Sequence, residues 1–177
     1  MNVVYALFER YPDAREEVGE LLDREYDQSE MNAIVQAHVA KEYMDLDLES
    51  VSVRVTDAVG ERTARGFDPF LAAQMPAPVP GLGEMYAAGE PSFLKKGHSD
   101  GALATVMVKT AIAHGGGIEG LQFALNDAVP VSAAHDFAAG VSRGGVLFWI
   151  RTHDERDSAA MQTLRRHGGK YVDDYVD

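Results

Sequence analysis

The sequence contains no cysteine, only one tryptophan among 177 residues, and few basic side chains. The absence of cysteine excludes disulfides, thiolate nucleophiles, iron–sulfur clusters and cysteine-ligated zinc sites. Only 16 lysines and arginines stand against 28 acids, which gives a net charge of −12 with histidine neutral. Because attraction to phosphate needs a positive field, we expect neither a general nucleic-acid binder nor a binder of anionic membranes.

Long hydrophobic runs are also missing. The longest uncharged stretch, residues 69–83, contains four prolines and is too short and too broken for a membrane-spanning helix. No basic region precedes the first apolar run, so no targeting segment is expected there. We therefore expect a soluble cytoplasmic protein. A peripheral membrane role would instead require an exposed apolar surface on residues 101–125.

The length and the apolar fraction of 46% predict one folded domain that spans residues 1–177. The first fifty residues hold 13 acids and 4 bases, so most of the negative charge lies there. Of the 17 glycines, 12 lie within residues 81–145. The chain thus divides into two ordinary ends around a middle rich in glycine and proline.

A strand–helix–strand unit is predicted at each end. The first unit, about residues 3–37, opens with the apolar run Val3–Phe8, and a helix follows at Pro12. The acids of residues 9–49 are expected on the solvated face of this helix. A strand at about residues 31–37 closes the unit.

The second unit, about residues 145–176, begins with the buried-type strand Val146–Ile150, in which Trp149 is expected to need a partner for its indole N–H. Gly168-Gly169 ends the helix that follows, and residues 170–176 form an edge strand. The two units together predict an α+β fold with a ferredoxin-like arrangement, four strands with two helices on one face. The alternative is a doubly wound sheet, for which four strands are few.

An insertion of about residues 38–144 separates the two units. Alternation at residues 51–56 predicts a half-exposed strand, and the prolines and glycines of residues 76–83 predict a stiff turn. Helical spacing and capping predict three helices, over residues 101–114, over residues 118–126, and from a cap at Ser132 to about Val141.

Three stretches carry a resemblance to a known family. They are the opening strand and helix at residues 4–22, the Val-Pro-Gly-Leu-Gly turn at residues 79–83 with Ala-Ala-Gly at residues 87–89, and the run from Gly116 to Gly168. In this order they resemble the general stress protein 17M-like family, also called the heat-induced stress protein YflT-like domain. The resemblance implies a stress-associated protein with no established biochemical activity. Relatives often have a nearly charge-free middle, which Lys95, Lys96 and Asp100 interrupt in this chain.

Two glycine motifs could serve either structure or ligand binding. Residues 115–120, Gly-Gly-Gly-Ile-Glu-Gly, fit the G-x-G-x-x-G fingerprint of dinucleotide-binding loops, but that fingerprint needs a preceding strand. Residues 104–113 have helical spacing instead, so we favour a break between two packed helices and expect no cofactor. Residues 143–145, Arg-Gly-Gly, could form a nest for an anion, and we favour a turn out of the preceding helix.

Motifs for metal binding or nucleophilic catalysis are lacking. No two of the six histidines are three or four residues apart, so no metal site is predicted, although a fold could still bring His98, His114 and His135 together. The sequence also lacks the Gly-x-Ser-x-Gly motif that carries the nucleophilic serine of many hydrolases. The candidate ligand-binding residues are His114, His135, Asp136 and Arg143, which a pocket could bring together.

Two functions compete. The first is a non-enzymatic, stress-associated protein that acts by self-association or by binding a partner or a small molecule. A four-stranded sheet leaves one face without helices, and the insertion or another subunit must cover it, so a homodimer or a higher even oligomer is expected. The alternative is a small enzyme or ligand-sensing domain with a pocket between the sheet and the middle segment.

Overall fold

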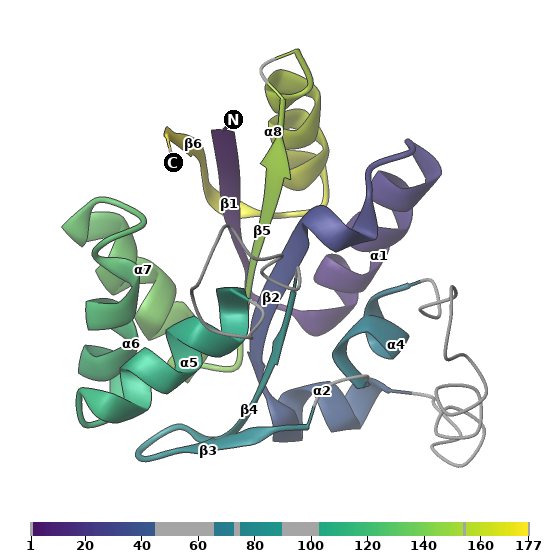
Figure 1. Ribbon diagram of the computed structural model, residues 1–177. Helices are drawn as coiled ribbons and strands as arrows, with labels where there is room; N and C mark the ends of the chain where they lie inside the picture. Colours follow the sequence, from purple (N-terminus) through teal and green to yellow (C-terminus); the bar gives the residue numbers. More distant parts are fainter. Residues whose placement is uncertain (1, 45–65, 73–74, 90–102, 154, 177) are drawn as a thin grey trace, which may run out of the picture.

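A computed structural model of the chain describes residues 2–44, 66–72, 75–89, 103–153 and 155–176 (Figure 1). At its centre lies a six-stranded antiparallel sheet with the strand order β3-β4-β2-β5-β1-β6. The strands are β1 (Asn2–Phe8), β2 (Met31–Gln36), β3 (Ala77–Val79), β4 (Gly83–Ala88), β5 (Val146–Thr152) and β6 (Lys170–Val176).

Helices cover both faces of the sheet, so the described residues form three layers (Figure 1). The helices on one face are α1 (Tyr11–Asp23), α2 (Ala37–Tyr43), α4 (Phe67–Ala72) and α8 (Asp157–Arg166). The helices on the other face are α5 (Leu103–Ala113), α6 (Gly117–Leu125) and α7 (Val131–Ser142). A short 3-10 helix, η1 (Gln28–Glu30), leads into β2. None of the described helices combines the length and the apolar character needed to cross a membrane.

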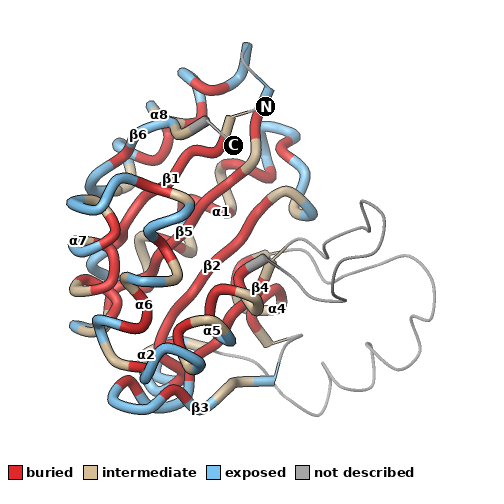
Figure 2. The backbone as a smooth tube through the Cα atoms, turned by 60° about the vertical axis from the view of Figure 1, so that its left-hand side comes forward, coloured by how far each residue is buried: buried red, intermediate tan, exposed pale blue. Residues whose placement is uncertain are grey.

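Successive side chains of the central strands enter two separate hydrophobic cores. In β5, Val146, Phe148 and Ile150 pack toward α1 and α8, whereas Leu147 and Trp149 pack toward α5–α7. Figure 2 shows these strands buried along nearly their whole length. Burial from both sides explains why their sequences are continuous apolar runs rather than alternating ones.

Both predicted strand–helix–strand units are present, as β1–α1–β2 and β5–α8–β6. The mixed helix-and-sheet class is therefore confirmed. The expectation of four strands is wrong, because the insertion adds β4 beside β2 and then β3 beside β4.

The two added strands begin in the segment predicted as a stiff turn. The Leu82 N–H donates to the Val79 carbonyl at 3.0 Å, and Gly81 and Gly83 adopt φ angles of 78° and 73°. Glycine takes such left-handed angles at little cost, so the turn can reverse the chain within a few residues. Pro78 lies in the short edge strand β3, where a missing N–H is tolerated. The turn chemistry was visible in the sequence, but the pairing of β4 with β2 depends on a long-range contact.

The insertion also covers the second face of the sheet. Leu121 and Leu125 of α6 and Phe137 of α7 are buried in the core on that face. Among the described residues, the sheet therefore needs no second subunit to cover its apolar surface. The reason for expecting a homodimer is removed, and the oligomeric state stays a prediction.

One further expectation for the insertion is wrong, and another cannot be compared with the described residues. Ser132 does not cap α7, because the helix begins at Val131 and Pro130 occupies the N-cap position without a side-chain bond. The strand predicted at residues 51–56 lies outside the described residues.

Two buried polar side chains on the α5–α7 face have no hydrogen-bond partner within the described part of the chain. Asn32 of β2 and Trp149 of β5 are cross-strand neighbours, and both are fully buried. The Trp149 ring stacks on Tyr5 with centroids 5.5 Å apart, but its N–H finds no acceptor there. An unpaired buried amide loses its hydration without compensation.

Replacing Asn32 by leucine is therefore expected to raise the free energy of unfolding by about 1–2 kcal/mol. Gln36 offers a matched control on the same strand, since its Nε2 donates to the Leu82 carbonyl at 3.1 Å. Gln36→Leu removes that bond and should lower the stability. Urea unfolding measures the free energy of unfolding of both variants. A destabilised Asn32→Leu protein would contradict the expectation.

Candidate functional site

A shallow groove of about 250 Å³ lies between α7 and the edge strand β6. Figures 1 and 2 both place α7 beside the strands at this end of the sheet. The groove is lined by residues from the first turns of α7 and from one stretch of β6, namely Ser132, Ala133, Asp136, Tyr171, Val172, Asp173 and Tyr175. It therefore lies where the insertion meets the sheet, the location expected for a ligand pocket.

The periodicity of each element brings these side chains together. On α7, positions 132, 133 and 136 lie near one another because helical neighbours recur after three or four residues. On β6, Asp173 and Tyr175 are two residues apart and point to the same face, whereas Tyr171 has a φ of 55° and lies where the β1–β6 register shifts. Tyr171 and Tyr175 meet the aromatic cluster beneath the groove, with ring centroids 6.2 Å from Phe137 and 5.5 Å from Tyr5 respectively.

The groove is acidic and aromatic. Asp136 and Asp173 supply two carboxylates, Tyr171 and Tyr175 supply two rings, and no basic residue occurs among the described residues that line it. Burial raises the pKa of the Tyr175 hydroxyl, and the charges of Asp173 and Asp174 raise it further. Only the part of this rise that is due to the two aspartates, each a smaller cause than burial, reflects a local negative field.

Two main-chain groups of β6 are engaged by side chains. The Val172 carbonyl accepts from the Arg165 guanidinium at 2.9 Å, and the Asp174 N–H donates to Asp173 Oδ1 at 3.0 Å. Groups engaged in this way are less available to an added strand, which is how edge strands are commonly protected from pairing.

The structure separates the four candidate residues predicted from the sequence. Asp136 lies half-buried in the groove. His135 is exposed, with Nδ1 3.3 Å from Gln122 Oε1 of α6, and His114 stacks on Phe123, also of α6. Arg143 is exposed at the C-terminal end of α7. Only Asp136 is therefore among the residues that line the groove.

Sequence reasoning missed the partners of Asp136 in the groove. Tyr171, Asp173 and Tyr175 belong to the strand predicted at residues 170–176. The β1–β6 register shifts between Lys170 and Asp173, so alternation along the strand accounts for Asp173 and Tyr175 but not for Tyr171. The sequence contained no signal that this face lies against α7.

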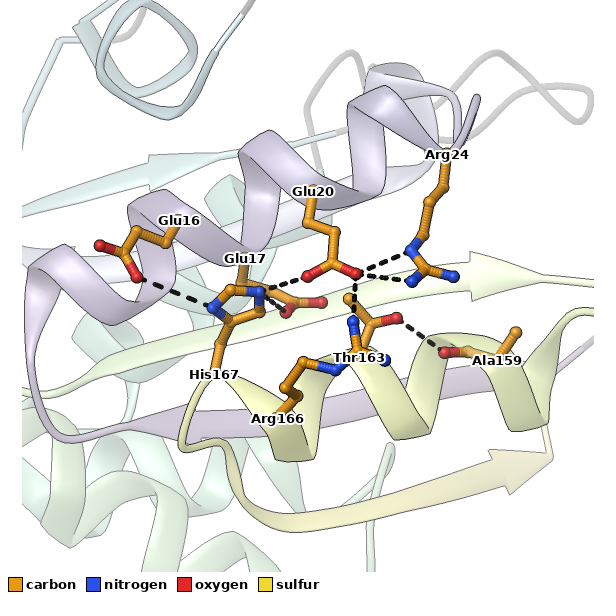
Figure 3. A network of polar contacts seen from close by, with 8 residues as sticks. All are labelled: Glu16, Glu17, Glu20, Arg24, Ala159, Thr163, Arg166 and His167. Atoms are coloured by element: carbon orange, nitrogen blue, oxygen red, sulfur yellow. Dashed lines mark hydrogen bonds and ion pairs between the residues drawn. The ribbon is translucent and has the colours of Figure 1, made fainter.

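A second polar constellation joins α1 to α8 on the other face of the sheet (Figure 3). Glu20 is its centre, since Oε1 accepts from Arg24 Nε at 2.8 Å and from Arg166 Nη1 at 2.5 Å. His167 Nε2 lies 2.5 Å from Glu20 Oε2. The hydrogen bond with His167 is the main cause of a lowered pKa at Glu20, with smaller contributions from Arg24 and Arg166 against the opposing effect of desolvation.

Glu17 lies inside this constellation without a hydrogen bond of its own. Its side chain is fully buried, and neither carboxyl oxygen has a hydrogen-bond partner among the described residues. Desolvation, followed by the neighbouring charge of Glu20, raises the pKa of Glu17 to about 8. The group is therefore mainly protonated at pH 7.

The expectation that the acids of residues 9–49 lie on the solvated face of the first helix is wrong for Glu17. Its position three residues after Ala14 and four before Leu21 places it on the buried side of α1. Helical periodicity alone would have predicted a buried position for Glu17. The residue was assigned to the solvated face because glutamate is usually charged and exposed.

The segment that matches G-x-G-x-x-G, residues 115–120, allows two helices to pack closely. It lies between helices α5 and α6 rather than after a strand, and the Gly117 N–H donates to the Pro80 carbonyl at 2.7 Å. A Cβ on Gly120 would lie 2.5 Å from the Ala111 carbonyl oxygen. The preferred interpretation, a break between two packed helices, is confirmed for these residues.

The Arg143-Gly144-Gly145 motif forms the turn that leaves α7. Gly144 has a φ of 94°, and a Cβ on Gly145 would lie 2.9 Å from the Phe8 carbonyl oxygen. These contacts account for both glycines by conformation and close approach.

Comparisons with known proteins found no matching family model, no matching curated protein and no matching solved structure. Within the described residues, no group of three or more histidine and acidic side chains is arranged to hold a metal ion. The description of the site therefore depends on the geometry of the groove and of the α1–α8 constellation.

Proposed function

We propose that the protein is a binding protein that takes a small organic cation into the α7–β6 groove. The observation that carries the proposal is the lining of the groove, where two carboxylates and two tyrosine rings lie together without a basic residue among the described ones. Carboxylates form strong charge-assisted hydrogen bonds with an ammonium group. Tyrosine faces stabilise the same cation through their ring quadrupoles.

The volume of the groove limits the size of the ligand. About 250 Å³ is smaller than the roughly 300–1,000 Å³ typical of sites for drug-sized molecules. A compact amine with a short apolar body matches this volume and this chemistry. An extended peptide that adds a strand is less well supported, because Val172 and Asp174 use main-chain groups of β6 for side-chain bonds.

The residues that line the groove support a binding function rather than a catalytic one. A nucleophile needs a base within hydrogen-bond reach. Among the described residues that line the groove, Ser132 carries the only aliphatic hydroxyl. His135, the neighbour of Asp136 in sequence, has its imidazole near Gln122 instead. The proposal therefore assigns the groove a ligand and no reaction.

We also propose that β1–α1–β2 and β5–α8–β6 form a ferredoxin-like core to which the insertion is attached. The strand order β6-β1-β5-β2 and the position of α1 and α8 on the same face support this arrangement. In this proposal the β3–β4 hairpin extends one edge of the core, and α5–α7 cover the face that the core leaves bare.

A stress association, a cytoplasmic location and a homodimer or higher even oligomer also remain proposals. The first follows from the sequence resemblance, and the second is the expectation stated in the sequence analysis. The self-association proposal is weakened by the helices that cover the second face of the sheet.

The cation proposal is tested with matched pairs of small compounds. Benzylamine and 1,5-diaminopentane are compared with benzyl alcohol and 1,5-pentanediol, which keep the shape and lack the charge. Only the amines are expected to raise the melting temperature, because a ligand at about 100 times its Kd stabilises a protein by about 2.7 kcal/mol. Amide chemical shifts should change at residues 132–136 and 171–175.

Equal effects of the amines and the alcohols would contradict the cationic ligand class. Shift changes that leave both walls of the groove untouched would contradict the site. Sodium chloride at matched ionic strength controls for nonspecific screening of the acidic surface.

A further inference from the structure

The seam between α1 and α8 holds a buried carboxyl group in an unusual setting. The charged and titratable groups around Glu17 come from both helices and are Glu16, Glu20, Arg24, Arg166 and His167 (Figure 3). Arg24, Arg166 and His167 all pair with Glu20. Among the described residues, Glu17 is left with one distant polar contact, 3.8 Å from its Oε2 to His167 Nε2.

A protonated Glu17 is compatible with this closed seam. A neutral carboxyl costs much less to bury than a charged one, although its unused hydrogen-bonding groups still cost some stability. It also adds no negative charge beside Glu20, so the partners of Glu20 can keep their positions.

An ionised Glu17 is not compatible with the same geometry. A buried charge without hydrogen bonds must gain water or a partner. The two nearest routes are to draw His167 or Arg166 away from Glu20, or to separate the last turn of α8 from α1. Both routes disturb the C-terminal end of α8.

The end of α8 is tied directly to the start of β6. The Gly169 N–H donates to the Leu164 carbonyl at 2.9 Å, and the Arg165 guanidinium donates to the Val172 carbonyl at 2.9 Å. A displacement of the last turn of α8 therefore reaches the first residues of β6 through two hydrogen bonds.

We propose that Glu17 makes the α1–α8 seam a pH-responsive latch, which is closed while this buried carboxyl is protonated and which loosens α8 and the start of β6 when it ionises. The latch is a property of the α1–α8 layer. It does not depend on the ligand proposed for the groove, although Tyr171 and Val172 at the start of β6 also line that groove.

The direction of the pH effect follows from proton linkage. Burial raises the pKa of Glu17 from 4.5 to about 8, so between these values the folded chain holds a proton that the unfolded chain has lost. Stability contributed by this proton therefore falls as the pH rises through that window and levels off above it. Glu20 has the opposite effect. Because its pKa is lowered in the folded chain, it contributes stability at pH values above the ordinary pKa of a glutamate, and this contribution is lost as the pH falls into the acid range.

The test uses the full chain and two isosteric variants. Glu17→Gln fixes a neutral group in the seam, whereas Glu16→Gln changes an exposed neighbour whose side chain is 71% accessible. Between pH 6 and pH 9 the melting temperature of the wild type and of Glu16→Gln is expected to fall by about 5–10 °C relative to Glu17→Gln. Hydrogen-exchange protection of amides in α8 and early β6 should fall about tenfold in the wild type and stay constant in Glu17→Gln.

A direct titration completes the test and decides the outcome if Glu17→Gln fails to fold. The side-chain carboxyl of Glu17 in the ¹³C-labelled wild-type protein should titrate well above the exposed glutamates. The proposal is overturned if Glu17 titrates near 4.5, or if Glu17→Gln has the same pH dependence as the wild type.

Discussion

Replacing Gly116 by alanine is expected to lower the free energy of unfolding by about 2–4 kcal/mol, one of the two largest effects we anticipate. Gly116 has a φ of 69°, a conformation that alanine adopts only under strain. A Cβ there would also collide with the Pro80 carbonyl oxygen and lie 3.0 Å from Pro80 Cβ. That carbonyl accepts the Gly117 N–H, so it cannot move without losing a bond that ties α6 to the β3–β4 turn.

Gly19→Ala is the matched control for this substitution. Gly19 lies within α1, and apart from its chain neighbours and the backbone of its own helix, a Cβ there would have no heavy atom within 4 Å. Alanine is a better helix former than glycine, so this variant should be more stable by up to about 1 kcal/mol. Urea unfolding measures both changes. If the two variants have equal stability, the glycine motif is not constrained by packing, and its resemblance to a dinucleotide-binding loop would need to be reconsidered.

Removing both carboxylates of the groove is expected to abolish most of its affinity for cations. Each of Asp136→Asn and Asp173→Asn should weaken binding of benzylamine about tenfold, and the double variant about 100-fold, because a hydrogen bond to a charged group contributes about 1.5–3 kcal/mol. The 100-fold figure takes the two losses as additive, and a smaller loss in the double variant would measure their coupling through the shared ligand. Asn keeps the shape of the lining, so the protein itself should stay folded. Isothermal titration calorimetry measures the affinity.

Asp174→Asn is the control for the loss of charge alone. Asp174 follows Asp173 on β6 but is not among the residues that line the groove. Its removal changes the net charge by the same amount as either single variant and should change the affinity less than twofold. A tenfold loss in Asp174→Asn would mean that the general acidity of this end of the protein, rather than the groove, attracts the cation.

Local sequence rules predicted the elements at both ends of the chain. The apolar run before Glu9 became β1, and Gly168-Gly169 ended α8, because both depend on neighbours close in sequence. The same rules failed where the outcome depended on distant partners. The stretch Gly83–Ala88 was not recognised as a strand, since its pairing with β2 joins segments about fifty residues apart.

The candidate site divides in the same way. Asp136 was identified from the sequence and lies in the groove, whereas His114, His135 and Arg143 do not line it. All four were grouped by chemical type, and chemical type does not determine which helix face a residue occupies in the packed protein. Their role as ligand-binding residues outside the groove stays a prediction.

The net charge, the lack of cysteine, the mixed helix-and-sheet class and the two terminal units were determined by the sequence alone, because each depends on composition or on local periodicity. Only the tertiary structure decided that the insertion covers the second face of the sheet, that α7 and β6 border a shallow acidic groove, and that Glu17 is buried between two helices. The physical reason is that burial sets the cost of a charge, and burial is a property of segments packed together rather than of residues in a row.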